Sequence, residues 1–334
     1  MAVTGTGTQA DPFIVHSYTE FISLSNHAAV EDSSVYIQFF DDEHPNQTIN
    51  CNSYGSEFKW GQFTGKADVT TFINLNGCTI KNLLIDENCA MFYAVGFNDT
   101  YPHWHAAKIK VSNGAILNIF ASAASSKLIV GQVDFFNVSI SINSAGTTGK
   151  LISGAANDKR CNIDNSSIYL DHSKLYTHLI DYTNITDSDM KFYVTDMNSF
   201  FLFQYCDVIG CRIQGKLGGL FYRTGNYPSF HFDVIGYNYG SGASAEAKLV
   251  LTNCVIDIDI SEATLNWTGA PIYMIGLYND ASLNTNVICK SHWVPNYSVP
   301  SDWNYMVHEG AESIRNGSYL NEEGFVCAIV VAGG

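Results

Sequence analysis

The sequence predicts an all-β fold in which short strands coil around and stack on one another. A unit made of a β-rich run and a second apolar run recurs between residues 135 and 223, and the β-rich runs open at 135, 161, 184 and 206, advancing by 26, 23 and 22 residues. A loose period in the low twenties with two or three strands per period is typical of coiled β architectures. The 29 Asn and 27 Gly residues suit turns and stacked polar ladders, and few segments have the composition of helices.

The first 34 residues read as a strand followed by a capping helix. Residues 13–15 form a short apolar strand, and residues 17–24 follow with Ser17 at the N-cap and Glu20 at the third helical position. This spacing is that of a capping box. A short helix here would close the open apolar end of the coiled stack.

Residues 35–290 are predicted to form the coiled body. Strands are expected at 35–40, as a pair within 72–85, at 91–95, at 115–120 and at 127–130, ahead of the repeated units. The second apolar runs of those units are 150–154, 178–182, 200–205 and 219–223. After residue 223 the period falters: residues 227–247 read as an insertion, 248–260 as a strand pair and 271–278 as a further apolar run. Residues 291–334 are expected to form an irregular aromatic segment with a last strand at 325–330.

Charge and cysteine usage limit the classes of partner. The net charge of −15 repels phosphate backbones and anionic membranes, so neither nucleic-acid binding nor membrane insertion is expected. The nine cysteines lack a CxxC pair and mostly lie in apolar runs, which indicates buried reduced thiols and folding in a reducing cytosol. Residues 1–12 are polar, so no signal peptide is expected.

No cofactor is predicted from the motifs. Residues 5–10 fit G-x-G-x-x-A, but no strand precedes them and Asp11-Pro12 follows, so the phosphate-binding helix of a dinucleotide site cannot begin there. Walker A, HExxH and G-x-S-x-G sequences do not occur.

Two stretches carry a resemblance to a known family. GTGTQADPFIV at 5–15, followed by the short Tyr-Thr-Glu-Phe helix, resembles the N-termini of β-helical virion proteins of bacteriophages. NLNGCTIKNL at 74–83 is similar to the sequences of single coils in pectate-lyase-like right-handed parallel β-helices. The resemblance implies a right-handed parallel β-helix, a homotrimer, and a place in a virion as a capsid decoration, head fibre or tail-associated part.

The sharpest candidate for chemistry is the pair Asp257 and Asp259. In the run 255–260 the isoleucines point one way and the two aspartates the other, with residues i and i+2 roughly 6.5–7 Å apart. That separation fits the acid–base carboxylates of an inverting glycosidase, and calcium binding is an alternative. The remaining alternative is a solvated outer face of the coil.

Two further clusters have functional and structural interpretations. His103 and His105 would share one face of a strand and can ligate a metal, but no Cys or carboxylate nearby completes a site. The C-terminal segment places aromatic side chains close together, which suits either stacking on sugar rings or a subunit interface. Those aromatic residues are Trp293, Tyr297, Trp303 and Tyr305.

The sequence therefore favours a non-enzymatic structural component of a phage virion that folds in the host cytoplasm. Its expected partners are further copies of itself, as a homotrimer, and other virion proteins. The alternative is a receptor-binding tail spike that binds or depolymerises a host surface polysaccharide, as a glycan hydrolase or lyase, with Asp257 and Asp259 as the catalytic pair.

Overall fold

The chain folds into two compact units. Unit 1 comprises Met1–Gly146 and Leu151–Tyr169, and unit 2 comprises Thr147–Lys150 and Leu170–Gly334. The division predicted from the sequence, with boundaries at 34/35 and 290/291 between the N-terminal segment, the coiled body and the aromatic segment, stays a prediction. The computed structural model describes residues 2–25, 34–51, 63–65, 69–87, 89–94, 107–123, 125–148, 151–155, 159–175, 179–198, 202–222, 232–235, 249–259, 263–266, 272–275, 288–292, 318–320 and 325–329.

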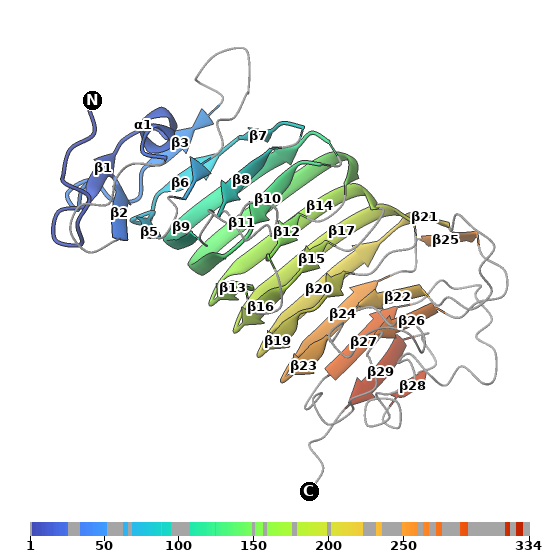
Figure 1. Cartoon of the computed structure of the whole chain (residues 1–334). Coiled ribbons are helices and arrows are strands. Elements are labelled where there is room, and N and C mark those ends of the chain that lie inside the picture. Colours follow the sequence, from blue (N-terminus) through green and yellow to red (C-terminus); the bar gives the residue numbers. More distant parts are fainter. Residues whose placement is uncertain are drawn as a thin grey trace, which may run out of the picture. The chain divides into compact units, whose positions relative to one another are not determined.

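The described residues of unit 1 form one helix and a succession of strands (Figure 1). The helix is α1 (Tyr18–Ser23). The strands are β1 (Phe13–Val15), β2 (Ser34–Phe39), β3 (Thr48–Asn50), β4 (Phe63–Thr64), β5 (Thr70–Asn74), β6 (Thr79–Lys81), β7 (Leu84–Ile85), β8 (Ala90–Tyr93), β9 (Lys108–Ala121), β10 (Lys127–Val130), β11 (Val133–Thr148), β12 (Ile152–Ser153) and β13 (Cys161–Asp164). Strand β14 (Ser167–Leu175) begins in unit 1 and continues in unit 2, and the last two residues of β11 also belong to unit 2.

The long sheet of unit 1 is entirely parallel. Strands β1, β2, β5, β9, β11 and β13 pair in that order, each parallel to the next (Figure 1). Their side chains alternate between buried and outward positions, as in β2 with its intermediate–buried repeat. In register, the inward positions stack like on like, so that Ile37 lies beside Ile73 and Ile73 beside Val111.

A second parallel sheet closes the core of unit 1. It runs β4, β8, β10, β12, with Phe63 beside Phe92 and Ile129 beside both Phe92 and Ile152. The ring of Phe92 meets that of Phe135 on β11 with centroids 5.8 Å apart, so the core lies between the two sheets. Parallel sheets are normally covered on both faces. On the outer face of the long sheet from β2 to β13, many of the outward side chains are half-buried, and those of Lys110 and Phe136 are exposed.

The predicted short helix near the N-terminus is confirmed as α1, with Ser17 at its N-cap. The Ser17 hydroxyl accepts a hydrogen bond from the Glu20 N–H at 3.1 Å, and the Glu20 carboxylate accepts one from the His16 N–H at 2.7 Å. The first bond satisfies a backbone donor in the first turn of α1, and the second satisfies the His16 N–H just ahead of the N-cap, where a full capping box would use the Ser17 N–H. The helix directs Phe21, which is fully buried, onto Phe63 with ring centroids 4.4 Å apart.

Asparagine supplies the turns between strands and ties neighbouring turns together. Twelve non-glycine residues in the described ranges have positive φ, and eight of them are Asn, which tolerates the left-handed conformation better than most residues. One ladder of side-chain amides joins four strands or their flanks: Asn82 donates to Asn50 at 2.9 Å, Asn118 donates to Asn82, and Asn143 donates to Asn118 at 2.8 Å. The predicted polar ladders are therefore present in unit 1.

Unit 2 repeats the parallel arrangement. Its strands after β14 are β15 (Ile180–Asp181), β16 (Thr183–Thr186), β17 (Asp189–Asn198), β18 (Phe203–Gln204), β19 (Asp207–Ile209), β20 (Arg212–Leu217), β21 (Gly219–Tyr222), β22 (Phe232–Ile235), β23 (Val250–Thr252), β24 (Val255–Asp259), β25 (Ala263–Asn266), β26 (Ile272–Ile275), β27 (Ile288–His292), β28 (Ser318–Leu320) and β29 (Phe325–Ile329). The parallel series are β16–β19–β23, β17–β20–β24–β27, β17–β21–β25, β15–β18 and β22–β26.

One equivalence assumed in the predicted repeat is wrong. The repeat predicts that the apolar runs at 200–205 and 219–223 are equivalent. The first contains β18, which pairs with β15, whereas the second contains β21, which pairs with β17 and β25. Met197 near the end of β17 lies opposite Phe221. The run at 219–223 therefore continues the sheet that contains the β-rich runs. This explains the short interval of 18 residues between Leu202 in the run at 200–205 and Leu220 in the run at 219–223.

The architecture is all-β, with long all-parallel sheets that are consistent with a parallel β-helix. The predicted strand at 325–330 is present as β29, which pairs antiparallel with both β27 and β28 within its own fold. Among the described residues, no helix has the length and apolar character needed to cross a membrane.

Of the seven cysteines whose side chains the structure describes, all are free thiols and five are buried. Burial raises the pKa of Cys211 to about 12 and also raises the pKa of Cys254. A neutral buried thiol stabilises the fold fully below its ordinary pKa of 9.0, and this contribution is lost as the pH rises toward about 12. The buried five are Cys78, Cys161, Cys206, Cys211 and Cys254.

Alkylation provides a check on these thiols. Because the thiolate is the reactive form, we expect iodoacetamide at pH 8 to leave the five buried cysteines unmodified in the folded protein and to label all of them in urea. Mass spectrometry of tryptic peptides measures both states. Rapid labelling of Cys211 and Cys254 in the folded protein would contradict the prediction.

Candidate functional site

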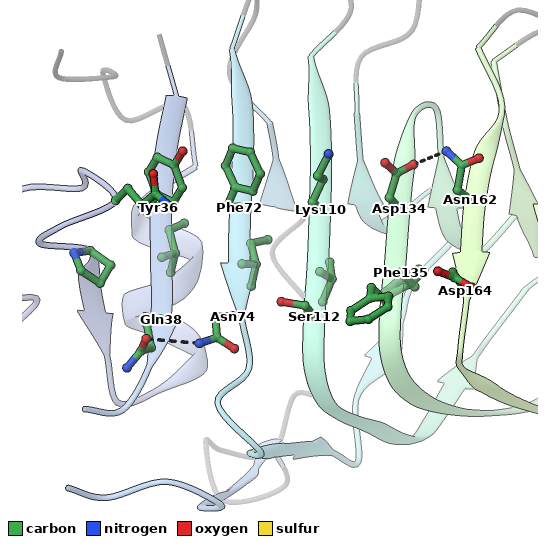
Figure 2. A pocket seen from close by; sticks show the side chains of 16 residues that line it. Tyr36, Gln38, Phe72, Asn74, Lys110, Ser112, Asp134, Phe135, Asn162 and Asp164 are labelled. Atoms are coloured by element: carbon green, nitrogen blue, oxygen red, sulfur yellow. Dashed lines mark hydrogen bonds between the residues drawn. The ribbon is translucent and has the colours of Figure 1, made fainter. Parts of the chain in front are cut away.

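A groove lies on the outer face of the long sheet of unit 1. Strands β2, β5, β9, β11 and β13 line it, together with Gln9 and Pro12 ahead of β1, and its volume is about 510 Å³ (Figure 2). Because side chains alternate along each strand, the residues that face outward here are those between the buried positions. Two outward rows cross the strands side by side.

The first row runs through aromatic and charged side chains. Tyr36 lies opposite Phe72 with the two rings stacked, their centroids 4.6 Å apart and their planes at 4°. Lys110 follows on the next strand, with its ammonium nitrogen 5.5 Å from the centre of the Phe72 ring. This distance fits a cation–π contact, so the row forms one continuous stack (Figure 2).

Asp134 continues the first row and is held from two sides. Lys108 approaches its Oδ2 at 2.8 Å, and the Asn162 amide donates to its Oδ1 at 2.6 Å. Lys110 lies opposite Asp134 in register. The carboxylate therefore serves as a fixed acceptor that orders the side chains around it.

The second row is more polar and ends in an exposed aromatic ring. The Asn74 amide donates to Gln38 at 3.2 Å, and the Gln38 amide donates to Asp42 at 2.9 Å. Ser112 and then Phe136 follow in register, and Asp164 lies opposite Phe136. The Phe136 side chain is 51 % exposed, whereas the adjacent Phe135 is 1 % exposed.

This mixture of groups suits the binding of a polar ligand with apolar faces. It offers an exposed ring, a cation, a hydroxyl and carboxylates in positions fixed by a hydrogen-bonded sheet. No sequence motif marks this groove. The available signal was the outward position of Tyr36 and Phe72 within otherwise alternating strands, where polar residues are usual.

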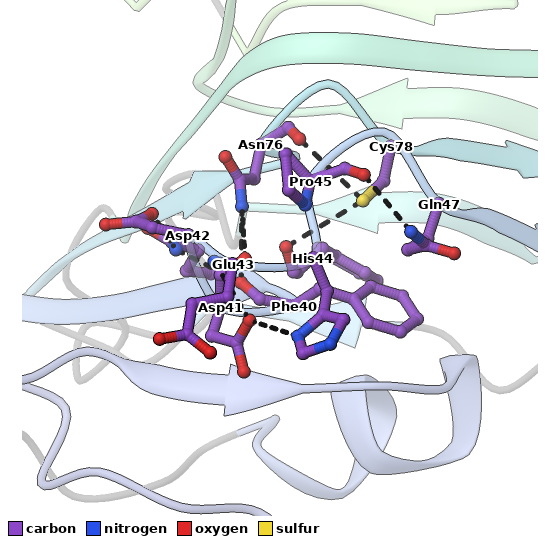
Figure 3. A network of polar contacts seen from close by, with 11 residues as sticks. Phe40, Asp41, Asp42, Glu43, His44, Pro45, Gln47, Asn76 and Cys78 are labelled. Carbon is purple, nitrogen blue, oxygen red and sulfur yellow. Dashed lines mark hydrogen bonds and ion pairs between the residues drawn. The ribbon is translucent and has the colours of Figure 1, made fainter.

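The acidic turn after β2 borders the polar row (Figure 3). His44 Nδ1 lies 2.7 Å from Asp41 Oδ1, and this hydrogen bond is the largest cause that lowers the pKa of Asp41. The Asn76 amide donates to the Asp41 carbonyl at 3.1 Å, which ties this turn to the turn after β5. Within the described ranges, no group of three or more His, Cys, Asp or Glu side chains can hold a metal ion.

The predicted carboxylate pair lies on β24 in unit 2. Ile256 and Ile258 are fully buried while Asp257 is exposed and Asp259 is half-buried, so the predicted alternation is confirmed. In register, Asp257 has Gln214 and Lys290 as neighbours. Asp259 has Lys216 and His292.

The register position of Lys216 opposite Asp259 gives this part of the pair a structural interpretation. Opposite charges on adjacent strands stabilise a sheet by roughly 0.2–1 kcal/mol per pair. The catalytic role of Asp257 and Asp259 stays a prediction. The other predicted site residues, His103, His105, Trp293, Tyr297, Trp303 and Tyr305, lie outside the described residues.

Comparison with known proteins gave no relative: no family model, no curated protein and no solved structure matches this chain.

Proposed function

We propose that this protein is a non-enzymatic structural component of a bacteriophage virion, built as a right-handed parallel β-helix. The observation that carries the proposal is the in-register parallel stacking of strands, seen in β2, β5, β9 and β11 of unit 1. Such a stack uses its backbone hydrogen bonds internally, and the amide ladders add cross-links between turns. The link to a virion comes from the stretch at residues 5–15, which resembles the N-termini of phage virion proteins, and the stretch at 74–83 supports the β-helix.

The proposed place is in a capsid decoration, a head fibre or a tail-associated part, after folding in the host cytoplasm. Its partners would be other virion proteins and further copies of itself. Particles purified through a density gradient should contain the protein, and its absence from washed, intact particles would overturn the assignment.

Self-association as a homotrimer is the first solution property to measure. Stacks of β-coils leave open edges, and symmetric neighbours can cover them. We expect light scattering after size-exclusion chromatography to give about three times the chain mass of 36.8 kDa. Dilution through the micromolar range serves as the control, and a single monomeric species throughout would contradict the prediction.

A second candidate function is recognition of a host surface glycan, as in a receptor-binding spike. The observation that favours it is the groove of unit 1, where Tyr36, Phe72 and the exposed Phe136 accompany fixed polar side chains. Cleavage of the glycan forms no part of this candidate.

A further inference from the structure

We propose that the groove on the outer face of unit 1 binds an uncharged pyranose glycan, with Phe136 as the surface on which a sugar ring stacks. The inference deepens the second candidate function and does not depend on the virion assignment. It rests on the exposure of Phe136, on the polar groups around it and on the balance of charge in the groove.

The exposed ring is the first argument. Phe136 belongs to β11, whose neighbouring Phe135 is buried in the core, so its side chain is directed outward by the strand alternation. Pyranose rings have apolar faces made of C–H groups, and these pack well on the flat face of an aromatic side chain. Tyr36 and Phe72 lie on the same outer face, three and two strands away from β11.

The polar groups of the groove fall into two sets. Gln38, Asn74 and Asp134 are engaged in hydrogen bonds or ion pairs with protein groups, and they hold the walls in place. Lys110, Ser112 and Asp164 make no side-chain hydrogen bond or ion pair to the described part of the chain. These three supply a donor, a donor–acceptor hydroxyl and an acceptor, which are the groups that sugar hydroxyls require.

Charge selects among glycans. The charged residues that line the groove are Lys110, Asp134 and Asp164, while Lys108 pairs with Asp134 from beside it and Asp42 borders it at Gln38, so the site has no excess of positive charge to hold a polyanion. The whole chain carries a net charge of −15, which repels polyanions at long range. An uncharged glycan therefore fits this groove better than one rich in uronic or sialic acids.

The groove is also rigid before any ligand arrives. Its floor is a parallel sheet, and in its second row the side-chain amide of Asn74 donates a hydrogen bond to that of Gln38. The Asn113 and Asn137 amides extend that ladder over the following turns at 3.3 Å and 3.2 Å. Little ordering of side chains is then needed on binding, which favours recognition of a flexible oligosaccharide.

Saturation-transfer NMR tests the inference directly. The folded protein is mixed in turn with cellohexaose, maltohexaose, mannohexaose and hexagalacturonic acid, and its methyl and aromatic protons are saturated. We expect transfer to ring protons of at least one of the three neutral sugars, and weaker or no transfer to the acidic one. No transfer to any neutral sugar, or stronger transfer to hexagalacturonic acid, would overturn the proposal.

Three variants locate the site. Phe136→Ala should weaken binding of the responding sugar by about tenfold or more, as central aromatic residues commonly do. Phe136→Tyr should retain binding because the stacking surface remains. Phe120→Ala is the matched control, since Phe120 is 41 % exposed on β9 but does not line the groove.

Phe136→Ala and Phe120→Ala should both leave the midpoint of thermal unfolding unchanged within experimental error, because both side chains are exposed. A loss of binding can then be separated from a loss of folding. Equal loss of binding in Phe120→Ala and Phe136→Ala, or no loss in Phe136→Ala, would remove the groove as the site. The oligomer mass and the particle composition report on the virion proposal separately.

Discussion

Replacing Gly131 with alanine is expected to destabilise the protein by about 2–5 kcal/mol. Gly131 follows β10 with φ of +95°, a left-handed conformation that costs other residues about 1–2 kcal/mol. A Cβ atom at this position would also overlap the carbonyl oxygen of Ala94 on the adjacent turn. Because the obstacle is backbone, it cannot move aside as a flexible side chain would.

A second glycine provides the matched control. Gly218 is not in the left-handed region, and a Cβ there would meet only the Tyr193 hydroxyl at 3.9 Å. Gly218→Ala should therefore leave stability unchanged or raise it by up to about 1 kcal/mol, through the lower entropy of the unfolded chain. Urea denaturation followed by far-ultraviolet circular dichroism compares the two variants, and equal midpoints would refute the argument about Gly131.

Sequence patterns predicted the strands well where alternation is strict. The run at 35–40 corresponds to β2, and the run at 72–85, predicted as a pair of strands, contains three, β5, β6 and β7. Buried and outward residues alternate within β2 and β5, whereas the turn at residues 75–78 interrupts the alternation. The capping box predicted the helix because Ser17 and Glu20 act locally, within four residues. Local interactions of this kind need no knowledge of the rest of the fold.

The extent and equivalence of strands depended on tertiary pairing and was less predictable. Strand β9 runs through residues 108–121, although only 115–120 was predicted, because Lys108 to Ser112 pair with β5. Likewise β21 resembles the earlier second apolar runs in composition but joins a different sheet. Composition alone does not distinguish two apolar runs that face the same core from different sides.

The groove could not be predicted from the sequence because it, too, depends on how the strands pair. Its first row joins Tyr36, Phe72, Lys110 and Asp134, which are separated along the chain by 36, 38 and 24 residues. These unequal intervals arise from the different lengths of the segments between strands, so no constant period aligns the four positions. By contrast, Asp257 and Asp259 are neighbours in one strand and were easy to find.

Truncating Phe21 to alanine should cost about 3–5 kcal/mol, the usual range for a buried phenylalanine. Phe21 is fully buried at the centre of an aromatic cluster, with ring centroids 4.4 Å from Phe63, 5.2 Å from Phe39 and 6.5 Å from Phe92. These partners come from both sheets of unit 1, so the ring joins α1 to each of them. Its loss would leave a cavity at the end of the core that α1 covers.

Two further variants separate packing from capping. Phe21→Leu keeps most of the apolar volume and should cost roughly 1.5 kcal/mol or less. Ser17→Ala removes the hydroxyl that accepts from the Glu20 N–H and should cost about 1 kcal/mol, without opening a cavity. Urea midpoints measure all three, and the order Phe21→Ala, Phe21→Leu, wild type is the expected order of rising stability. If Phe21→Ala lost no more stability than Ser17→Ala, α1 would contribute little to the core of unit 1. The core at that end would then have to be covered by another segment.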